Sequence, residues 1–522
     1  MTPPKDSFDI DFLFINQLSY VFNKYSESPN AAEFTDQCIK IASQCLQLMD
    51  KYGALHPSFD SFISFLRSQN HPNPYDQRWA VKIQSSSDSH QANLNSLFKK
   101  IHTSSTASSA PSANKELYAN VRKAVIMCII ERKYQDAIGH LNNYSAVVQF
   151  STQPRDHTQL RDNRYIEYSF FQYVIGIFDL IWLPLDNSNF APPERGFPYG
   201  TQRMAPVPTG NFKNLDAISR KVASYYTKSE SLLTSTEEEN SDHSELYYFW
   251  LMKFYGFTVL FKQFNFREFY DEFISLFIKY QSPNPQLELS PVALLAERVP
   301  VLKSDLLCMF GIVSIFVKPF NSLALMDIGN DDILLDLFNL DEKSFEYVLY
   351  NEVMVPLSEA NNKKVKTSLV DNAILQDMFI ASLDYLVPVI NQKSQSAVSA
   401  SLRFMRYLTL IIDLKNFLLI ISVIKQAPRL KIIQLLGYDT NNLSEASISQ
   451  ISQILLSLVA ALGLGEIGIG FNAQQDVFCN DIVDHNQGSK KLQKSLTDLT
   501  ADVEAESLAA LMTGALLEKF FS

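Results

Sequence analysis

The sequence predicts an almost entirely α-helical protein with one short β-hairpin near its C-terminal end. Apolar residues recur at spacings of three and four through most of the 522 residues, which is the pattern of amphipathic helices. Glycine is scarce, at 16 residues, and this disfavours α/β folds that need glycine-lined loops. A strand-like alternation stands out in EIGIGF and DVFC, which the polar turn NAQQ joins within residues 466–479.

The first 84 residues are predicted to form an N-terminal helical region. Its clearest helix shares one apolar face among Cys38, Ile41, Cys45, Leu48 and Met49. A second helix is expected over residues 59–66. Residues 85–114 are rich in serine and poor in large apolar residues, so we expect a mobile linker or an exposed loop there.

Residues 115–374 predict stacked helical repeats, that is, an α-solenoid. Tyr134, Ala137, Ile138 and Leu141 occupy positions i, i+3, i+4 and i+7, and the small residue among large ones lets antiparallel helices approach closely. The following helices are dense in Phe and Tyr, of which the chain has 37 and 23. A proline-rich loop at 191–208 and a Ser/Glu-rich segment at 229–244 interrupt the array.

Residues 429–480 predict a compact unit of two helices and a hairpin. A short helix ends at Gly437, and Ser444 can cap a second helix. The second helix has an apolar face formed by Ile448, Ile451, Leu455, Leu458 and Leu462. Ile467, Ile469 and Phe471 then alternate as in a strand, with Val477 on the returning strand. This order is typical of a small winged helix.

The segments LKIIQLLGYD, SQISQILLSLVAALG, EIGIGF and DVFCN, preceded by a helical array, resemble the PCI domain. That family provides subunits of the proteasome lid, the COP9 signalosome and translation initiation factor three. The resemblance covers residues 375–480 well and the array more loosely. The connection NNLSEAS and the glycine-dense GLGEIGIG depart from it at the entry to the wing.

The resemblance implies that PCI-type subunits are the partners of this chain, because such subunits assemble side by side through their winged helices. Wing edges can extend a sheet across subunits by backbone hydrogen bonds. The expected contact residues of the wing are Glu466, Ile467, Ile469, Phe471, Asp476, Val477 and Cys479.

A long helix is predicted within residues 481–522, with a heptad seam of Leu492, Leu496, Leu499 and Val503. In the signalosome and the lid, C-terminal helices gather in a shared bundle, and the resemblance implies the same role for this seam. The alternative is that the helix folds back on its own chain.

Several patterns that suggest chemistry lack the context that the chemistry needs. Residues 463–468 match G-x-G-x-x-G, but a helix precedes them and a strand follows, the reverse of a dinucleotide site. The sequence has no H-x-H, H-E-x-x-H or C-x-x-C, so no local pattern supports a metal site. His485 beside Asp484 is interpreted as a solvated loop. We therefore expect no cofactor, no metal and no catalytic role.

Charge disfavours nucleic acid as a partner. The net charge is −11, and the helix at the recognition position of the winged helix carries no Lys or Arg, so the electrostatic term of phosphate binding is missing.

The apolar run 417–424 is too short for a membrane span and is expected to be a buried helix. The odd, scattered set Cys38, Cys45, Cys128, Cys308 and Cys479 predicts free thiols, mostly buried, in a reducing compartment. The expected location is cytoplasmic or nuclear.

These observations predict a non-catalytic scaffold subunit of a PCI assembly. The assembly expected first is similar to the COP9 signalosome, which removes a ubiquitin-like protein from cullins and contains a metalloprotease subunit. A lid or initiation-factor subunit and an adaptor in messenger-RNA export remain alternatives. So does an enzyme whose site is built from distant residues of the array.

Overall fold

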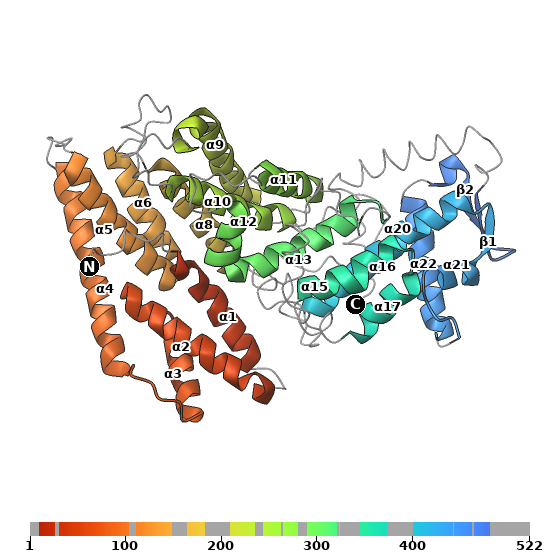
Figure 1. Ribbon diagram of the computed structural model, residues 1–522, viewed down its shortest axis with the longest axis horizontal. Coiled ribbons are helices and arrows are strands. Elements are labelled where there is room, and N and C mark those ends of the chain that lie inside the picture. Colours follow the sequence, from red (N-terminus) through yellow and green to blue (C-terminus); the bar gives the residue numbers. More distant parts are fainter. Residues whose placement is uncertain are drawn as a thin grey trace, which may run out of the picture.

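A computed structural model gives the architecture as mostly helical, with a small three-stranded antiparallel sheet near the C-terminal end (Figure 1). The structure describes residues 10–26, 31–103, 111–148, 164–182, 209–234, 244–262, 265–279, 290–320, 323, 345–372, 400–441, 443–461 and 464–480. The helices from residue 11 to 371 are called the helical array below, and residues 414–480 the terminal module.

The array begins with a compact N-terminal group of helices. They are η1 (Asp11–Phe14), α1 (Ile15–Ser26), η2 (Ala31–Phe34), α2 (Thr35–Tyr52) and α3 (Phe59–Ser68). The predicted helices of this region are confirmed: Cys38, Cys45, Leu48 and Met49 are buried on α2, and Ile41 is half-buried. Gly53 ends α2 in the left-handed conformation at φ +63°, which glycine adopts without strain.

The linker predicted at 85–114 is wrong for the part that the structure describes, because α4 (Gln77–Thr103) runs through it as one helix. Its buried stripe is Ala80, Ser87, Leu94 and Phe98. Ser87 lies in this stripe because its hydroxyl donates a 2.5 Å hydrogen bond to Glu131, which is also buried. A serine that binds a buried carboxylate can thus occupy a core position, and composition alone does not reveal it.

The helices predicted for the next part of the chain are confirmed. They are α5 (Pro111–Ile130) with α6 (Tyr134–Val148), then α8 (Tyr165–Trp182), α9 (Thr209–Thr234), α10 (Ser244–Lys262) and α11 (Phe266–Lys279). Part of the predicted Ser/Glu-rich break, residues 229–234, belongs to α9. The proline-rich break at 191–208 lies outside the described residues.

The array continues through shorter helices. They are α12 (Pro291–Ala293), the π-helix η3 (Leu294–Arg298), α13 (Pro300–Val317), α15 (Phe345–Leu349), the π-helix η5 (Tyr350–Met354), α16 (Val355–Ser358) and α17 (Asn362–Asp371). Ser290 caps α12 by accepting a hydrogen bond from the Ala293 N–H at 3.1 Å.

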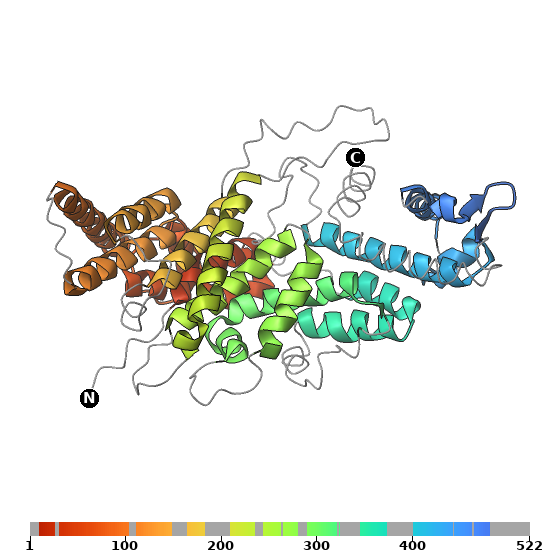
Figure 2. The same ribbon diagram turned by 90° about the horizontal axis from the view of Figure 1, so that it is seen from above.

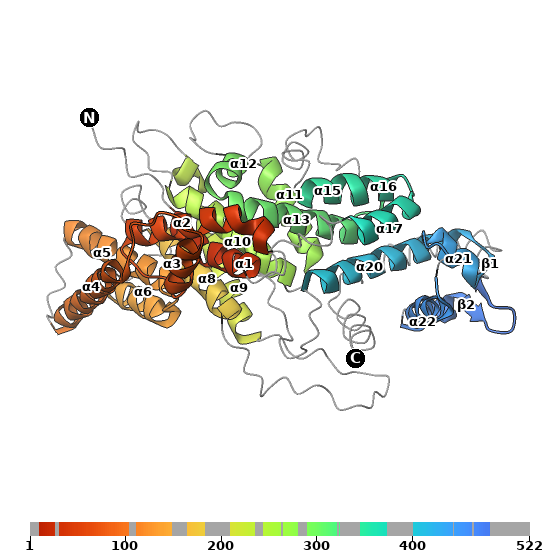
Figure 3. The ribbon, with the colours of Figure 1, turned by 90° about the horizontal axis from the view of Figure 1, so that it is seen from below.

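The helix α20 (Ala400–Val423) leads from the array to the sheet, and Figures 2 and 3 show it bridging the two parts. After it come β1 (Gln426–Pro428), α21 (Arg429–Leu435), α22 (Glu445–Ala461), η6 (Leu464–Ile467), β2 (Ile469–Asn472) and β3 (Val477–Asn480). Strand β1 was not predicted. Strand β3, the last strand in the described part of the chain, is central, in the order β1-β3-β2.

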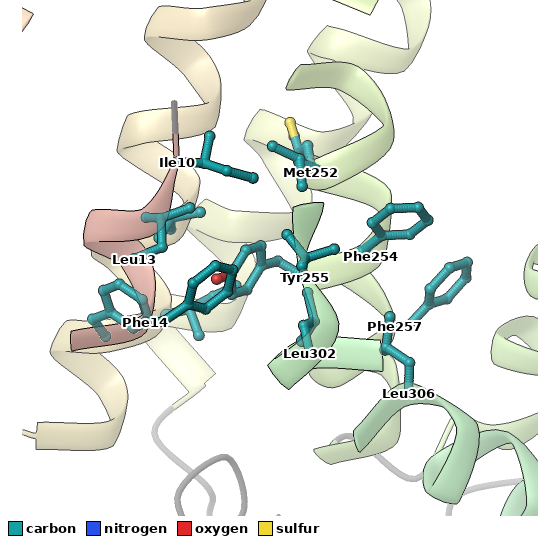
Figure 4. Close-up of a cluster of buried hydrophobic side chains, with 14 of the residues drawn as sticks. Ile10, Leu13, Phe14, Met252, Phe254, Tyr255, Phe257, Leu302 and Leu306 are labelled. Carbon is teal, nitrogen blue, oxygen red and sulfur yellow. The ribbon is translucent and has the colours of Figure 1, made fainter. Parts of the chain in front are cut away.

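The first residues that the structure describes lie inside the array, since Ile10, Leu13 and Phe14 are buried near side chains of α10 and α13 (Figure 4). Those neighbours include Met252, Phe254, Tyr255, Phe257, Leu302 and Leu306. Polar contacts fix the same segment: Asn16 donates to the Ile129 carbonyl at 3.1 Å, and Gln17 donates to Asp305 at 2.8 Å. The beginning of the chain therefore joins helices that follow much later.

Candidate interaction surface

The three strands of the terminal module pair around Phe478. Ala427 and Phe471 are its register partners on β1 and β2, and the Phe471 and Phe478 rings lie 4.9 Å apart. Phe417 of α20 also contacts Phe478 edge-to-face, and the centroids of the two rings lie 5.3 Å apart. Such aromatic contacts add to the apolar area that the module buries. Phe478 is therefore the centre of a small separate core.

The predicted wing residues fall into different elements. Ile469 and Phe471 are on β2 as expected, whereas Glu466 and Ile467 lie in the 3₁₀ helix η6, so their assignment to a strand is wrong. Gly468, at φ +89°, separates η6 from β2 and accommodates the change of direction.

Val477 and Cys479 lie on the returning strand as predicted, but that strand is central and both of its edges are paired. They cannot serve as a free wing edge, because the backbone groups of a central strand are already used. Asp476 precedes the strand at φ +54° and forms an ion pair with Arg429 at 3.1 Å. These three residues therefore do not lie on a free strand edge, and their contact with a neighbour stays a prediction. Among the described strands, β1 and β2 are the edges of the sheet.

The second helix of the module begins where the sequence predicts. The Ser444 hydroxyl accepts from the Ser447 N–H at 3.2 Å, and α22 starts at Glu445. Leu455 is buried in the module, and Ile448 and Ile451 are half-buried. Leu458 and Leu462 lie outside the described side chains.

The outer surface of α22 is polar but carries almost no charge. Its exposed residues are Glu445, Ala446, Ser449, Gln450, Gln453, Ser457 and Ala460. Residues 429–480 contain two basic and four acidic side chains in total. A surface of this kind attracts phosphates weakly.

The terminal module is attached to the array through a buried charge cluster. Lys366 of α17 forms an ion pair with Asp413 of α20, and both side chains are buried. Tyr438, which follows α21, donates to Asp413 at 2.5 Å and accepts from Lys366 at 3.1 Å. Burial raises the pKa of Asp413 and lowers that of Lys366, and each partner opposes the shift of the other. Side chains of α17, α20 and the segment after α21 thus meet at one buried cluster.

A second polar contact lies beside this cluster. Asn416 of α20 donates to Asn362 at 2.9 Å, and Asn362 donates to the Leu435 carbonyl at the end of α21 at 3.0 Å. Gly437 packs so closely that an added Cβ would lie 2.4 Å from the Asn362 carbonyl oxygen. Its φ of +91° also favours glycine. The start of α17 and the end of α21 are therefore in direct contact.

Lys415 ties α20 to the end of α13. Its ammonium donates to the carbonyl oxygens of Ile315, Phe316 and Lys318 at 2.6, 3.1 and 2.8 Å. Burial lowers the pKa of Lys415 to about 7, while the carbonyls at the negative end of the α13 dipole favour the charged form. Lys415 thereby caps α13 from another helix.

Sequence reasoning missed this junction, although a signal was present. In IIDLKNFLLII, Asp413, Lys415 and Asn416 interrupt an apolar helix. Polar residues inside an apolar run indicate buried hydrogen-bond partners. The partners of Lys415 and Asn416 lie about 50 to 100 positions earlier in the chain, and Asp413 binds Lys366 before it and Tyr438 after it. The local pattern does not identify these partners.

The run 417–424 is only partly buried, which corrects the expectation of a buried helix. Phe417 and Ile421 are in the module core, but Leu419 and Val423 are 50% and 77% exposed. In the part of the chain that the structure describes, no helix has the length and hydropathy to cross a membrane.

Two predicted groups cannot be placed. The seam of Leu492, Leu496, Leu499 and Val503 and the pair Asp484 and His485 lie outside the described residues. None of the five cysteines is in a disulfide; four of them are buried, and Cys479 is half-buried. The described side chains contain no group of three His, Cys, Asp or Glu arranged to hold a metal ion.

Comparison with known proteins adds no family assignment: no protein-family model matches the sequence, and no curated protein matches it.

Proposed function

We propose that this chain is a non-catalytic scaffold subunit of a multi-subunit PCI assembly, similar to the COP9 signalosome, that acts on neddylated cullins. The supporting observation is the order α20–β1–α21–α22–β2–β3 with β3 central in the sheet. A winged helix has the same order of elements and the same strand order. In this proposal the helical array corresponds to the α-solenoid that precedes the winged helix in PCI subunits.

The edge of β2 is the contact that we assign to a neighbouring subunit. Among the described strands, β2 pairs with β3 and has its other side available for an added strand. Ile469 and Phe471 belong to this strand, so two of the predicted contact residues remain in the proposal. The seam of the C-terminal helix remains the second proposed contact.

Charge favours a protein partner over the alternative of an RNA-export adaptor. The module has more acidic than basic residues, and α22 has no Lys or Arg. A neutral polar helix beside a strand edge suits a protein surface, where backbone hydrogen bonds supply affinity. The proposed location is the cytoplasm or the nucleus.

Affinity purification of the tagged full chain from its own cells, followed by mass spectrometry, tests the proposal. We expect several PCI subunits and a metalloprotease subunit to copurify in comparable amounts. Recovery of the chain without any such protein overturns the proposal. Recovery of lid or initiation-factor subunits instead overturns the signalosome assignment and keeps the scaffold role.

A matched pair of variants tests the β2 edge. No heavy atom lies within 4 Å of a Cβ added at Gly470, so Gly470→Lys fits the fold and places a charge on the edge strand. Gln474→Lys adds the same charge in the exposed turn. We expect the amount of neighbouring subunit that copurifies to fall at least tenfold with Gly470→Lys and to stay unchanged with Gln474→Lys. Equal recovery by both variants would show that the neighbour does not use this edge.

A further inference from the structure

One face of α20 is covered along its first part and open along its last part. Leu408, Ile412, Lys415, Leu419 and Val423 follow at spacings of four, three, four and four, so they share this face. Leu408 and Ile412 are 0% and 1% exposed in the core of the array, and Lys415 is bound to the end of α13. Beyond Lys415, the side chains of Leu419 and Val423 are exposed to solvent.

The last two residues of the stripe are called the open half-stripe. Six large hydrophobic side chains are exposed in the described part of the chain, and four of them lie between residues 419 and 435. Besides Leu419 and Val423, these four include Leu430 and Leu435 of the neighbouring helix α21. Apolar side chains that gather in this way mark a contact surface. The covered part of the same stripe shows that a helical element fits against it.

The described chain ends beside the open half-stripe. Asn480, the last residue of β3, donates from its side chain to the Ile421 carbonyl at 2.6 Å and from its backbone to the Lys425 carbonyl at 2.7 Å. Asn480, the last residue that the structure describes, therefore lies next to the last turn of α20. Eight residues separate Asn480 from residue 489, and they can span about 26 Å when extended. The segment from residue 489 is thus within reach of the whole open half-stripe.

We propose that, in the free subunit, residues 489–503 form a helix whose seam packs on the open half-stripe of α20. The seam residues are Leu492, Leu496, Leu499 and Val503. Leu419 and Val423 are four positions apart, as are Leu492 and Leu496, and as are Leu499 and Val503. Apolar residues at this spacing on two neighbouring helices pack against each other. The short connection gives the segment a local concentration in the millimolar range, which favours it over a separate partner.

The inference goes beyond the scaffold role, because it gives the free subunit a way to cover its own apolar surface. The seam that binds α20 is the one assigned above to a shared bundle. On entry into the bundle, the seam would then leave α20 and contact helices of other subunits. Whether the free subunit covers itself can be measured on the purified chain alone, so the two proposals fail independently.

Hydrogen exchange of the purified full-length monomer tests the contact. Leu496→Asp with Leu499→Asp removes two seam residues, and the matched control Gln493→Asp with Thr497→Asp adds the same charges outside the seam. We expect amides of residues 419–424 to exchange at least tenfold faster in the seam variant and unchanged in the control. Equal exchange in all three proteins overturns the proposal. Protection that depends on protein concentration overturns it in favour of a second copy.

A disulfide trap gives an independent measurement. Val423→Cys with Leu496→Cys is expected to form an intramolecular disulfide under mild oxidation at least tenfold faster than Glu445→Cys with Leu496→Cys, since Glu445 is exposed at the start of α22. Peptide mass analysis distinguishes this bridge from one to Cys479. Equal rates for the two pairs would contradict the proposal, and so would a bridge that forms only after partner subunits are added.

Discussion

The helical array and the terminal module are held together in different ways. The array has one continuous core in which aromatic rings contact each other from helix to helix, for example Phe257 with Phe269 and Phe273 at 5.2 and 5.1 Å. The core of the module is small and mostly aliphatic, consisting of Leu414, Phe417, Ile421, Ala427, Ile432, Leu436, Leu455, Leu464, Ile469 and Phe478. A core of this size gives little stability by itself.

The difference explains where the polar contacts lie. In the array, ion pairs such as that between the half-buried Arg122 and the buried Glu167 connect helices that already share a large apolar interface. In the junction, Lys366, Asp413 and Tyr438 connect the module to the array, and the apolar cores of the two regions are separate. The module therefore depends on its junction, whereas the array does not depend on any one polar contact.

The largest expected effect follows from removing the centre of the small core. Phe478→Ala is expected to cost about 4 kcal/mol and to unfold the module while the array stays folded. Phe170→Ala, at an equally buried site of the array, is the matched comparison. Hydrogen exchange measured by region checks this. If Phe478→Ala lowered protection evenly across both regions, the two regions would be one cooperative unit.

The next effect concerns the junction. Lys366→Met leaves Asp413 buried without its cation and is expected to cost about 3 kcal/mol. The double variant Lys366→Met with Asp413→Leu removes both charges and should recover most of that loss. Urea unfolding of the single and double variants measures the coupling. A double variant no more stable than Lys366→Met would refute the assigned pairing.

A smaller effect is expected at the close approach of α17 and α21. Gly437→Ala places a methyl group against the Asn362 carbonyl at a φ of +91° and is expected to cost about 1–3 kcal/mol. Gly465→Ala is the control, because no atom lies within 4 Å of its added Cβ. Thermal unfolding of the two variants gives the comparison, and equal values would contradict the contact.

The smallest effect is expected in the array and depends on pH. Burial, with a contribution from the charge of Glu167, raises the pKa of Glu245 to about 8. The folded chain then holds a proton that the unfolded chain releases, so stability falls as the pH rises from about 4.5 to 8. Glu245→Gln keeps an acceptor for the Ile166 N–H, which Glu245 binds at 2.9 Å.

The gain from Glu245→Gln should be of the order of 1 kcal/mol at pH 8, allowing for the partial exposure of this residue, and absent at pH 4. Denaturant unfolding measured across this range checks the slope. A wild-type slope that the variant retains would show that another group titrates. Because the array core is large, we expect this change to leave the terminal module unaffected.

The sequence was informative where contacts are local. The helices of 35–68, 115–148 and 165–182, the cap at Ser444 and the stop at Gly437 follow from spacing and residue type within a few positions. The errors have non-local causes. Residues 85–103 form a helix because Ser87 binds Glu131, 44 positions away, and β1 forms because it pairs with β3.

The same reason limited the prediction of the interaction surface. The alternation at 469–471 identified β2, but the central position of β3 follows from pairing with Ala427, a residue with no strand pattern around it. The apolar run 417–424 gives no indication that Leu419 and Val423 are exposed. They are exposed because α13 ends before it reaches them. Exposure of that kind depends on the length of a distant neighbour.

The central place of β3 also sets the order in which the protein can be made. Strand β1 pairs with a strand that the ribosome produces only after residues 429–476, at about 5–20 residues per second. During those seconds Ala427 and Phe417 have no Phe478 to cover them, although every helix of the array has already been synthesised. The array can therefore fold first and present α20 as a finished surface, on which the sheet closes last.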